Sequence, residues 1–271
     1  MPHPDSGNPI GVFDSGVGGL TVVRALMERL PFENIVYFGD TARVPYGVKS
    51  VETIAHYTTQ IAEFLLAKRV KLLVVACNTM AAVASQSVKD LSPVPVLDVI
   101  DAGALGAIAT TTKKQVGVIG TPTTINSNAY ARAIHQREPE MRIFSQACPL
   151  FVPLVEEGWL DHPVTRLTAQ EYLKPVLAQN IDTLVLGCTH YPLLRHLIQP
   201  RIGRRVAVID SSQAVALRLQ EYLGGHPDLA RSLSKTGRHR HYVSDVTPAA
   251  QDTANRIFER QVELIKVDDF G

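Results

Sequence analysis

Two short apolar runs in this sequence end in the same way, and this repetition constrains the fold more than any other feature. They lie within residues 72–79 (LLVVACNT) and 183–192 (TLVLGCTHYP), and each is followed by a cysteine and small polar residues. Uninterrupted apolar runs of this length are typical of strands buried on both faces of a parallel sheet. Ligands of open α/β sheets bind at the carboxyl ends of the strands, so Cys77 and Cys188 are predicted to lie where a site forms.

Strand-like and helix-like segments alternate along the whole chain, which favours parallel sheets. After a strand at residues 10–13, the spacing of Leu20, Val23 and Leu26 predicts an amphipathic helix. Further strands are expected at residues 34–39, 94–99, 115–120, 141–146, 206–210, 241–243 and 262–267. Further helices are expected from residue 50 onward and at residues 81–91, 102–111, 165–178, 214–223 and 247–260.

The order of these segments starts again in the middle of the chain. After Asp101, a helix, a strand and the polar turn at residues 120–124 repeat the strand and turn at residues 11–16. We therefore predict an α/β fold of two similar flavodoxin-like lobes, with mainly parallel sheets and an active-site cleft between them. Residues 1–100 and 211–271 would form the first lobe, and residues 101–210 the second.

Composition and charge exclude several classes of protein. The 271 residues carry a net charge of +1, which gives no electrostatic basis for binding nucleic acid or an anionic membrane. No apolar run approaches the roughly 20 residues of a membrane helix, and the N-terminal residues lack the apolar core of a signal peptide. The three cysteines include no Cys-x-x-Cys pair, which argues against a disulfide framework and a structural metal site. These features predict a cytoplasmic protein without bound metal.

A glycine-rich turn at residues 14–19 follows the first predicted strand and resembles a dinucleotide fingerprint, with Asp40 about twenty residues further on. The third glycine of that fingerprint would fall at Thr21 and is missing. Asp14 would also place a carboxylate where the pyrophosphate must bind. No lysine lies within either cysteine motif. We therefore predict chemistry without a dinucleotide or pyridoxal phosphate, and no cofactor.

Two lobes that each present a cysteine at a strand end would place one thiol on each wall of a cleft. This arrangement suits inversion of a carbon centre, in which one group removes a proton from one face and the other delivers a proton to the opposite face. A thiol can serve in both roles because its usual pKa is about 8.5. Asp14, Glu156 and His190 are candidates to create and hold the thiolate. Hydroxyl and amide side chains could bind a substrate's carboxylates: Ser15, Asn78, Thr79, Thr121 and Thr189.

Four motifs together carry a family resemblance: residues 11–20 (GVFDSGVGGL), 45–47 (PYG), 76–79 (ACNT) and 187–192 (GCTHYP). With these four motifs in this order along the chain, the sequence resembles the glutamate racemases of the aspartate/glutamate racemase superfamily over roughly residues 9 to 223. The resemblance implies interconversion of L- and D-glutamate without a cofactor, supplying D-glutamate for peptidoglycan in a bacterium. Family members are commonly homodimers, and some respond to cell-wall precursors or bind DNA gyrase. Such regulation cannot be read from this sequence.

The resemblance also implies roles for individual residues. Cys77 and Cys188 would be the two acid–base groups. Asp14, Glu156 and His190 would assist them. The residues expected to contact the substrate are Asp14, Ser15, Pro45, Tyr46, Gly47, Asn78, Thr79, Thr121, Thr189 and His190.

Each of these residues also has a structural interpretation. Asp14 could cap the helix that follows it, and Tyr46 could pack within its loop. Glu156 and its neighbour Glu157 could both be solvated surface residues. Cys148 has no polar residues after it and is interpreted as a small buried hydrophobe.

Other functions remain open at this stage. The same two thiols could racemise aspartate or a hydantoin, which sequence separates poorly from glutamate. A thiol hydrolase or transferase could use Cys188 with His190, but would leave Cys77 unexplained. A non-catalytic binding protein is disfavoured because both thiols are present. The basic segment at residues 238–241 is interpreted as a solvated loop, not as a nucleic-acid or metal site.

Overall fold

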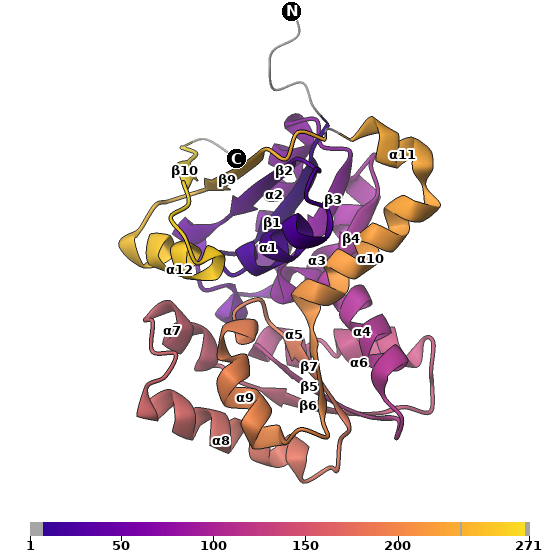
Figure 1. The fold of residues 1–271 in the computed structure, drawn as a ribbon, viewed down its shortest axis with the longest axis vertical. Coiled ribbons are helices and arrows are strands. Elements are labelled where there is room, and N and C mark those ends of the chain that lie inside the picture. Colours follow the sequence, from indigo (N-terminus) through magenta and orange to yellow (C-terminus); the bar gives the residue numbers. More distant parts are fainter. Residues whose placement is uncertain (1–7, 234, 269–271) are drawn as a thin grey trace, which may run out of the picture.

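In the computed structural model, residues 8–233 and 235–268 are described. Within them the first sheet has six strands, in the order β10-β9-β2-β1-β3-β4, and every pair is parallel. The strands are β1 (Ile10–Asp14), β2 (Ile35–Gly39), β3 (Leu72–Val75), β4 (Val96–Asp98), β9 (His239–Val243) and β10 (Ile265–Lys266). On one face lie α1 (Leu20–Arg29), α10 (Ser211–Gly225) and α12 (Pro248–Phe258); on the other lie α2 (Val51–Ala67) and α3 (Asn78–Leu91) (Figure 1).

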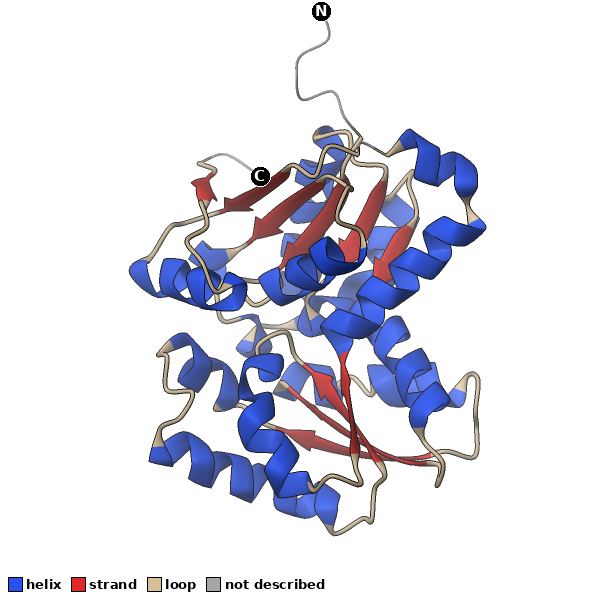
Figure 2. Ribbon diagram, viewed as in Figure 1, coloured by secondary structure: helices blue, strands red, loops and turns tan. Residues whose placement is uncertain are grey.

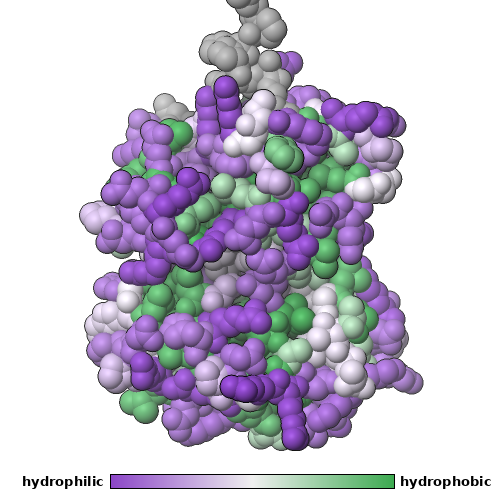
Figure 3. All heavy atoms as spheres, viewed as in Figure 1, coloured by the Kyte–Doolittle hydropathy of each residue, from purple (hydrophilic) through white to green (hydrophobic). Residues whose placement is uncertain are grey.

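The second sheet has four parallel strands in the same described part of the chain, in the order β6-β5-β7-β8. These strands are β5 (Gln115–Gly120), β6 (Arg142–Ala147), β7 (Thr183–Gly187) and β8 (Ala207–Asp210). The helices around it are α4 (Val99–Thr110), α5 (Pro122–Asn126), α6 (Ala129–His135), α7 (Phe151–Glu156), α8 (Pro163–Leu177) and α9 (Arg195–Ile202). Both sheets are therefore covered by helices, as Figure 2 shows. The outline of the molecule narrows between the two lobes (Figure 3).

The strand order confirms the predicted flavodoxin-like pattern. In the first sheet β2-β1-β3-β4 and in the second sheet β6-β5-β7-β8 both follow the order 2-1-3-4, and β9 and β10 extend the first sheet beyond β2. In such a sheet the chain changes direction between the first and third strands, and ligands bind outside the carboxyl ends of that pair. The site is therefore expected beyond the ends of β1 and β3 in one lobe, and of β5 and β7 in the other. The exact lobe boundaries stay a prediction.

Burial explains why the strand segments are so apolar. Every residue of β1, β3 and β7 is buried, because helices cover both faces of each sheet. Shorter connections complete the described fold: the 3-10 helices η1 (Thr41–Arg43), η2 (Tyr46–Val48) and η3 (Tyr191–Leu194), and the helix α11 (Pro227–Ser232). No helix among the described residues is long and apolar enough to cross a membrane.

Three local predictions differ from the structure. Helix α3 begins at Asn78 and not near residue 81, so that Cys77 lies directly before its first turn. Helix α9 was not predicted, because its charged residues and Pro200 obscure the apolar face formed by Leu197 and Ile198. The interpretation of residues 238–241 as a solvated loop is wrong. Residues 239–243 form β9 against β2, and His241 is buried.

Candidate active site

A cavity of about 280 Å³ lies between the lobes, where the carboxyl ends of the two sheets face each other. Its volume is at the small end of the range for ligand sites, which suits a small molecule. The described residues that line it include no lysine and no arginine. They are Ser15, Gly16, Val44, Pro45, Tyr46, Gly47, Val48, Cys77, Asn78, Thr79, Thr121, Pro122, Pro149, Val152, Pro153, Glu156, Cys188, Thr189 and His190.

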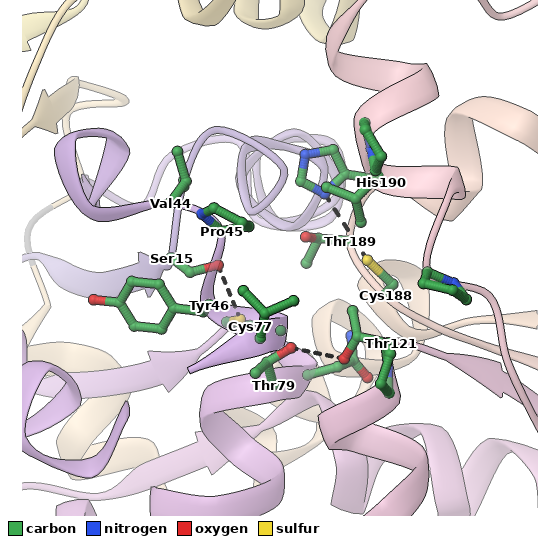
Figure 4. A pocket seen from close by; sticks show the side chains of 18 of the residues that line it. Ser15, Val44, Pro45, Tyr46, Cys77, Thr79, Thr121, Cys188, Thr189 and His190 are labelled. Atoms are coloured by element: carbon green, nitrogen blue, oxygen red, sulfur yellow. Dashed lines mark hydrogen bonds between the residues drawn. The ribbon is translucent and has the colours of Figure 1, made fainter. Parts of the chain in front are cut away.

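Cys77 forms the reactive part of the first wall. It follows β3 and directly precedes α3, and its side chain is buried beside Ser15, whose Oγ lies 3.3 Å from the Cys77 Sγ. Figure 4 shows these two side chains meeting at the cavity. Burial raises the pKa of Cys77 well above its usual value, and the neighbouring charge of Asp14 raises this pKa further. Cys77 is therefore a neutral thiol at neutral pH.

Asp14 lies behind Cys77 and is not among the residues that line the cavity. Its Oδ2 accepts hydrogen bonds from the backbone N–H of Gly19 at 2.8 Å and of Gly16 at 3.3 Å, which orders the turn before α1. Its Oδ1 is buried and has no hydrogen-bond partner among the residues that the structure describes. Burial raises the pKa of Asp14, and the positive charge of His190 opposes this rise. The carboxylate can therefore act through the Cys77 thiol, which it contacts, more readily than on a ligand.

Cys188, His190 and Glu156 form a row on the second wall. The Cys188 Sγ lies 3.9 Å from Nδ1 of His190, and Nε2 of His190 lies 3.2 Å from Oε1 of Glu156. Burial alone would lower the pKa of His190, but the interactions with Cys188 and Glu156 outweigh burial and raise this pKa to about 10. The imidazole is therefore protonated at neutral pH. A cation beside a cysteine favours its thiolate form.

The two thiols are thus chemically unequal although they occupy equivalent places in the two lobes. Cys77 lies near a buried carboxylate that disfavours a second negative charge, whereas Cys188 lies against an imidazolium. Figure 4 shows Ser15 and Cys77 on one side, and Cys188, Thr189 and His190 on the other. The two walls therefore present thiols in different electrostatic surroundings, one beside a carboxylate and the other beside an imidazolium.

Hydroxyl groups and backbone N–H groups provide the polar lining between the thiols. The hydroxyls of Thr79 and Thr121, one from each lobe, lie 3.0 Å apart. Asn78 is held by the Tyr130 hydroxyl, which donates to its Oδ1 at 2.7 Å. Helix α3 has no side-chain cap, so its first N–H groups point toward the cavity end of the helix, where they favour an anion.

The loop at residues 44–48 closes the first wall. Pro45 and Gly47 line the cavity, and the hydroxyl of Thr123 from the second lobe donates to the Gly47 carbonyl at 2.9 Å. Tyr46 also lines the cavity, but its ring extends away from the thiols (Figure 4) and its hydroxyl donates to Asp40. Tyr46 therefore combines the packing role expected from sequence with a place on the cavity wall.

Except for Asp14, all the residues predicted from sequence as catalytic or substrate-binding line this one cavity. Cys148 does not line it and is fully buried. Among the described residues, no group of three or more His, Cys, Asp and Glu side chains could hold a metal ion. Sequence reasoning missed lining residues that are mostly apolar and have no chemical signature: Gly16, Val44, Val48, Pro122, Pro149, Val152 and Pro153.

Gly18 was also missed, although it sets how closely the lobes approach. A Cβ atom at this position would lie 2.5 Å from the Thr189 Oγ1 and 2.6 Å from Nδ1 of His190. Such distances are well inside van der Waals contact. The absence of a side chain at Gly18 therefore lets the glycine-rich turn of the first lobe pack directly against the Cys188 motif.

Comparison with known proteins agrees with this geometry. The sequence model of the Asp/Glu/hydantoin racemase family matches residues 10–219. A glutamate racemase of Syntrophus aciditrophicus is 68% identical over 255 residues, which cover 94% of each chain. The crystal structure of a glutamate racemase from Bacillus anthracis superposes with a TM-score of 0.91 at 38% identity, covering 96% of this chain and 97% of that one. A glutamate racemase from Francisella tularensis in complex with D-glutamate gives a TM-score of 0.89 at 39% identity, covering 97% and 98% of the two chains.

Proposed function

The chain belongs to the Asp/Glu/hydantoin racemase family, and from this premise we propose that it is a glutamate racemase in which Cys77 and Cys188 move the α-proton of the substrate. The observation that carries this proposal is the pair of unequal thiols on opposite walls of one small cavity. A stereoinversion needs one base and one acid at opposite faces of the same carbon.

In the proposed reaction, the Cys188 thiolate removes the α-proton from one enantiomer. The electron pair of the broken C–H bond is left on the α-carbon and delocalises into the substrate carboxylate. The Cys77 thiol then donates its proton to the opposite face and becomes a thiolate, while Cys188 becomes a thiol. For the other enantiomer the same groups act in reverse, so the reaction needs no cofactor.

The assisting residues would stabilise the charges that move during this reaction. His190, held by Glu156, balances the negative charge on the Cys188 sulfur. Asp14, with its unpartnered Oδ1, is positioned to accept the Cys77 proton when Cys77 must act as the base. Ser15 can donate a hydrogen bond to the Cys77 sulfur when that sulfur is a thiolate.

The substrate's carboxylates would be bound without a cationic side chain. The donors available are the hydroxyls of Ser15, Thr79, Thr121 and Thr189, and the N–H groups at the start of α3. Neutral donors bind a carboxylate without a fixed positive charge that would stabilise the ground state and the transition state equally. Asn78 would contribute through the amide group that Tyr130 and Ser211 hold in place.

Racemisation in deuterium oxide tests this proposal. The purified protein would receive L-glutamate without added cofactor, while optical rotation and the α-proton NMR signal are followed. Loss of optical activity with incorporation of α-deuterium is expected. Cys77→Ala and Cys188→Ala should each abolish the reaction, and Cys148→Ala is the matched control that should retain it. Full racemisation by Cys77→Ala would refute the two-thiol mechanism.

The row of Cys188, His190 and Glu156 also has the form of a nucleophile, a base and an orienting carboxylate, which is the arrangement of a thiol hydrolase. A hydrolase would leave Cys77 and the adjacent Asp14 without a task. The same variants distinguish the two functions, because a hydrolase would form a covalent intermediate on Cys188 and would not require Cys77.

The biological setting follows from this function. We propose that the D-glutamate product supplies peptidoglycan synthesis and that the protein acts as a cytoplasmic homodimer. Sedimentation velocity over a range of concentrations would test the dimer. A substrate panel containing aspartate and hydantoins would test the choice of glutamate.

A further inference from the structure

Asp40 is a fully buried carboxylate at the end of β2 that the proposed reaction does not use. Its Oδ2 accepts from Nε of Arg43 at 2.6 Å and from the hydroxyl of Tyr46, and its Oδ1 accepts from the Ser244 hydroxyl at 2.8 Å. Three side-chain donors therefore converge on one carboxylate. Charge-assisted hydrogen bonds of this kind are stronger than neutral ones.

Two of the donors belong to the segment that leads into the cavity loop, residues 44–48. Arg43 directly precedes the loop, and Tyr46 lies within it and lines the cavity. Arg43 is held in turn by α2, because its Nη1 donates to Gln60 at 2.8 Å and its guanidinium stacks 3.9 Å from the centre of the Tyr57 ring. Asp40 therefore holds the loop through Arg43 and through the Tyr46 hydroxyl, which points away from the thiols (Figure 4).

The third donor comes from the C-terminal part of the chain. Ser244 follows β9, and its hydroxyl donates to Asp40 while accepting from the Ala42 backbone N–H at 2.8 Å. The Thr41 hydroxyl reaches the next residue, donating to the Asp245 carbonyl and accepting from its N–H. The family match ends at residue 219, so this part of the anchor lies outside the matched region.

We propose that Asp40 is a positioning residue that holds the cavity loop in its substrate-binding geometry, and that Ser244 makes the C-terminal segment part of this anchor. The inference rests on the proposed racemase function only for its kinetic test. The Asp40 carboxylate is not among the described residues that line the cavity, and it acts on the cavity loop through Arg43 and the Tyr46 hydroxyl. Its loss should weaken substrate binding and leave the proton transfer between the thiols largely intact.

The test compares Asp40→Asn with the wild-type protein in steady-state racemisation and in hydrogen–deuterium exchange. Both carboxylate oxygens of Asp40 accept hydrogen bonds, but only the oxygen of an amide can accept. The substitution therefore removes the hydrogen bonds at one of the two positions. We expect KM for glutamate to rise about tenfold or more, with kcat changed less than about threefold. Backbone exchange in peptides covering residues 41–48 should become faster, and exchange in peptides covering β7 should not change.

Asp182→Asn is the matched control. Asp182 also anchors a loop through several donors, including the Thr111 hydroxyl and the N–H groups of Thr112 and Lys113, but it precedes β7 at the end of the sheet away from the cavity. Its substitution should leave KM unchanged. An unchanged KM in Asp40→Asn would overturn the proposal, as would a fall in kcat at constant KM.

Ser244→Ala is the milder variant that decides the question if Asp40→Asn does not fold. It removes one buried hydroxyl and leaves the Asp40 carboxylate with its other donors, and a rise in KM at unchanged melting temperature supports the anchor. An unchanged KM in this variant would remove the C-terminal segment from the proposal. Hydrogen exchange keeps the test separate from the proposed function, because faster exchange at residues 41–48 does not depend on glutamate being the substrate.

Discussion

Replacing Glu156 by glutamine tests how the protein controls the charge of its second thiol. The change removes the carboxylate that lies 3.2 Å from Nε2 of His190 and keeps the shape of the side chain. Two unit charges at this distance interact by about 5 kcal/mol with an effective dielectric constant of about 20. The Glu156 side chain is 33% exposed, so solvent screens part of this interaction. We expect a remaining effect of about 1–2 kcal/mol, which lowers the pKa of His190 by about one unit.

The pH dependence of kcat/KM measures this shift. In the wild-type protein the pKa of His190 is about 10, so activity should fall at the alkaline side near that pH. In Glu156→Gln the alkaline limb should move to about pH 9, because deprotonated His190 leaves the Cys188 thiolate without a counter-charge. A racemisation has an equilibrium constant of one, so kcat/KM must fall equally in both directions.

Glu157→Gln is the control for this experiment. Glu157 is the adjacent residue on the same helix end but is exposed and does not line the cavity, so its profile should match the wild type. An alkaline limb that stays in place in Glu156→Gln would refute the assignment of an imidazolium at His190. So would equal effects of the two substitutions.

Three further substitutions have outcomes that the structure predicts. Gly18→Ala brings a Cβ against Thr189 and His190 and should lower kcat/KM by about tenfold or more, whereas Gly224→Ala, which meets nothing within 4 Å, should not. Tyr130→Phe removes the hydroxyl that donates to Oδ1 of Asn78 and should raise KM severalfold. The control is Tyr172→Phe, which should leave KM unchanged because Tyr172 does not line the cavity. Burial lowers the pKa of His241 to about 4, below its unfolded value of about 6.5. The stability that neutral His241 provides is therefore lost as pH falls from about 6.5 to about 4. The free energy of unfolding measured with urea should be about 2 kcal/mol lower at pH 5 than at pH 7. His241→Leu should remove that pH dependence. If the stability of this variant falls between pH 7 and pH 5 as much as that of the wild type, the role assigned to His241 is wrong.

The strands and the thiols could be predicted from sequence because their signals are local. An apolar run such as residues 183–187 has few alternatives to a buried strand, and the carboxyl end of such a strand is a site in any sheet of this class. Cys77 and Cys188 therefore emerge from pattern alone. Their partner His190 emerges from its place two residues after Cys188 in the sequence.

The remaining parts of the site depend on contacts between distant segments. Val152 and Pro153 reach the cavity only because α7 packs beneath the cleft, and nothing in their residue types indicates this. Asp40 fits a dinucleotide fingerprint by spacing, yet its partner Ser244 is 204 residues away. The strand expected at residues 241–243 begins two residues earlier, at His239, and the sequence pattern misses this start because the basic residues His239 and Arg240 look like part of a solvated loop. Local pattern carries no information about such pairings.

The two lobes have the same strand order, yet the chemistry at their strand ends has diverged, and a racemase needs both properties. Equivalent strand ends place Cys77 and Cys188 in related positions, so that they can address opposite faces of one carbon. If their surroundings were also equivalent, nothing would distinguish the thiol that gives a proton from the thiol that takes one. The buried Asp14 near Cys77 and the imidazolium of His190 near Cys188 make the two thiols different. The shared strand order of the lobes therefore provides the geometry of inversion, and the different charges of two neighbouring side chains distinguish the two thiols.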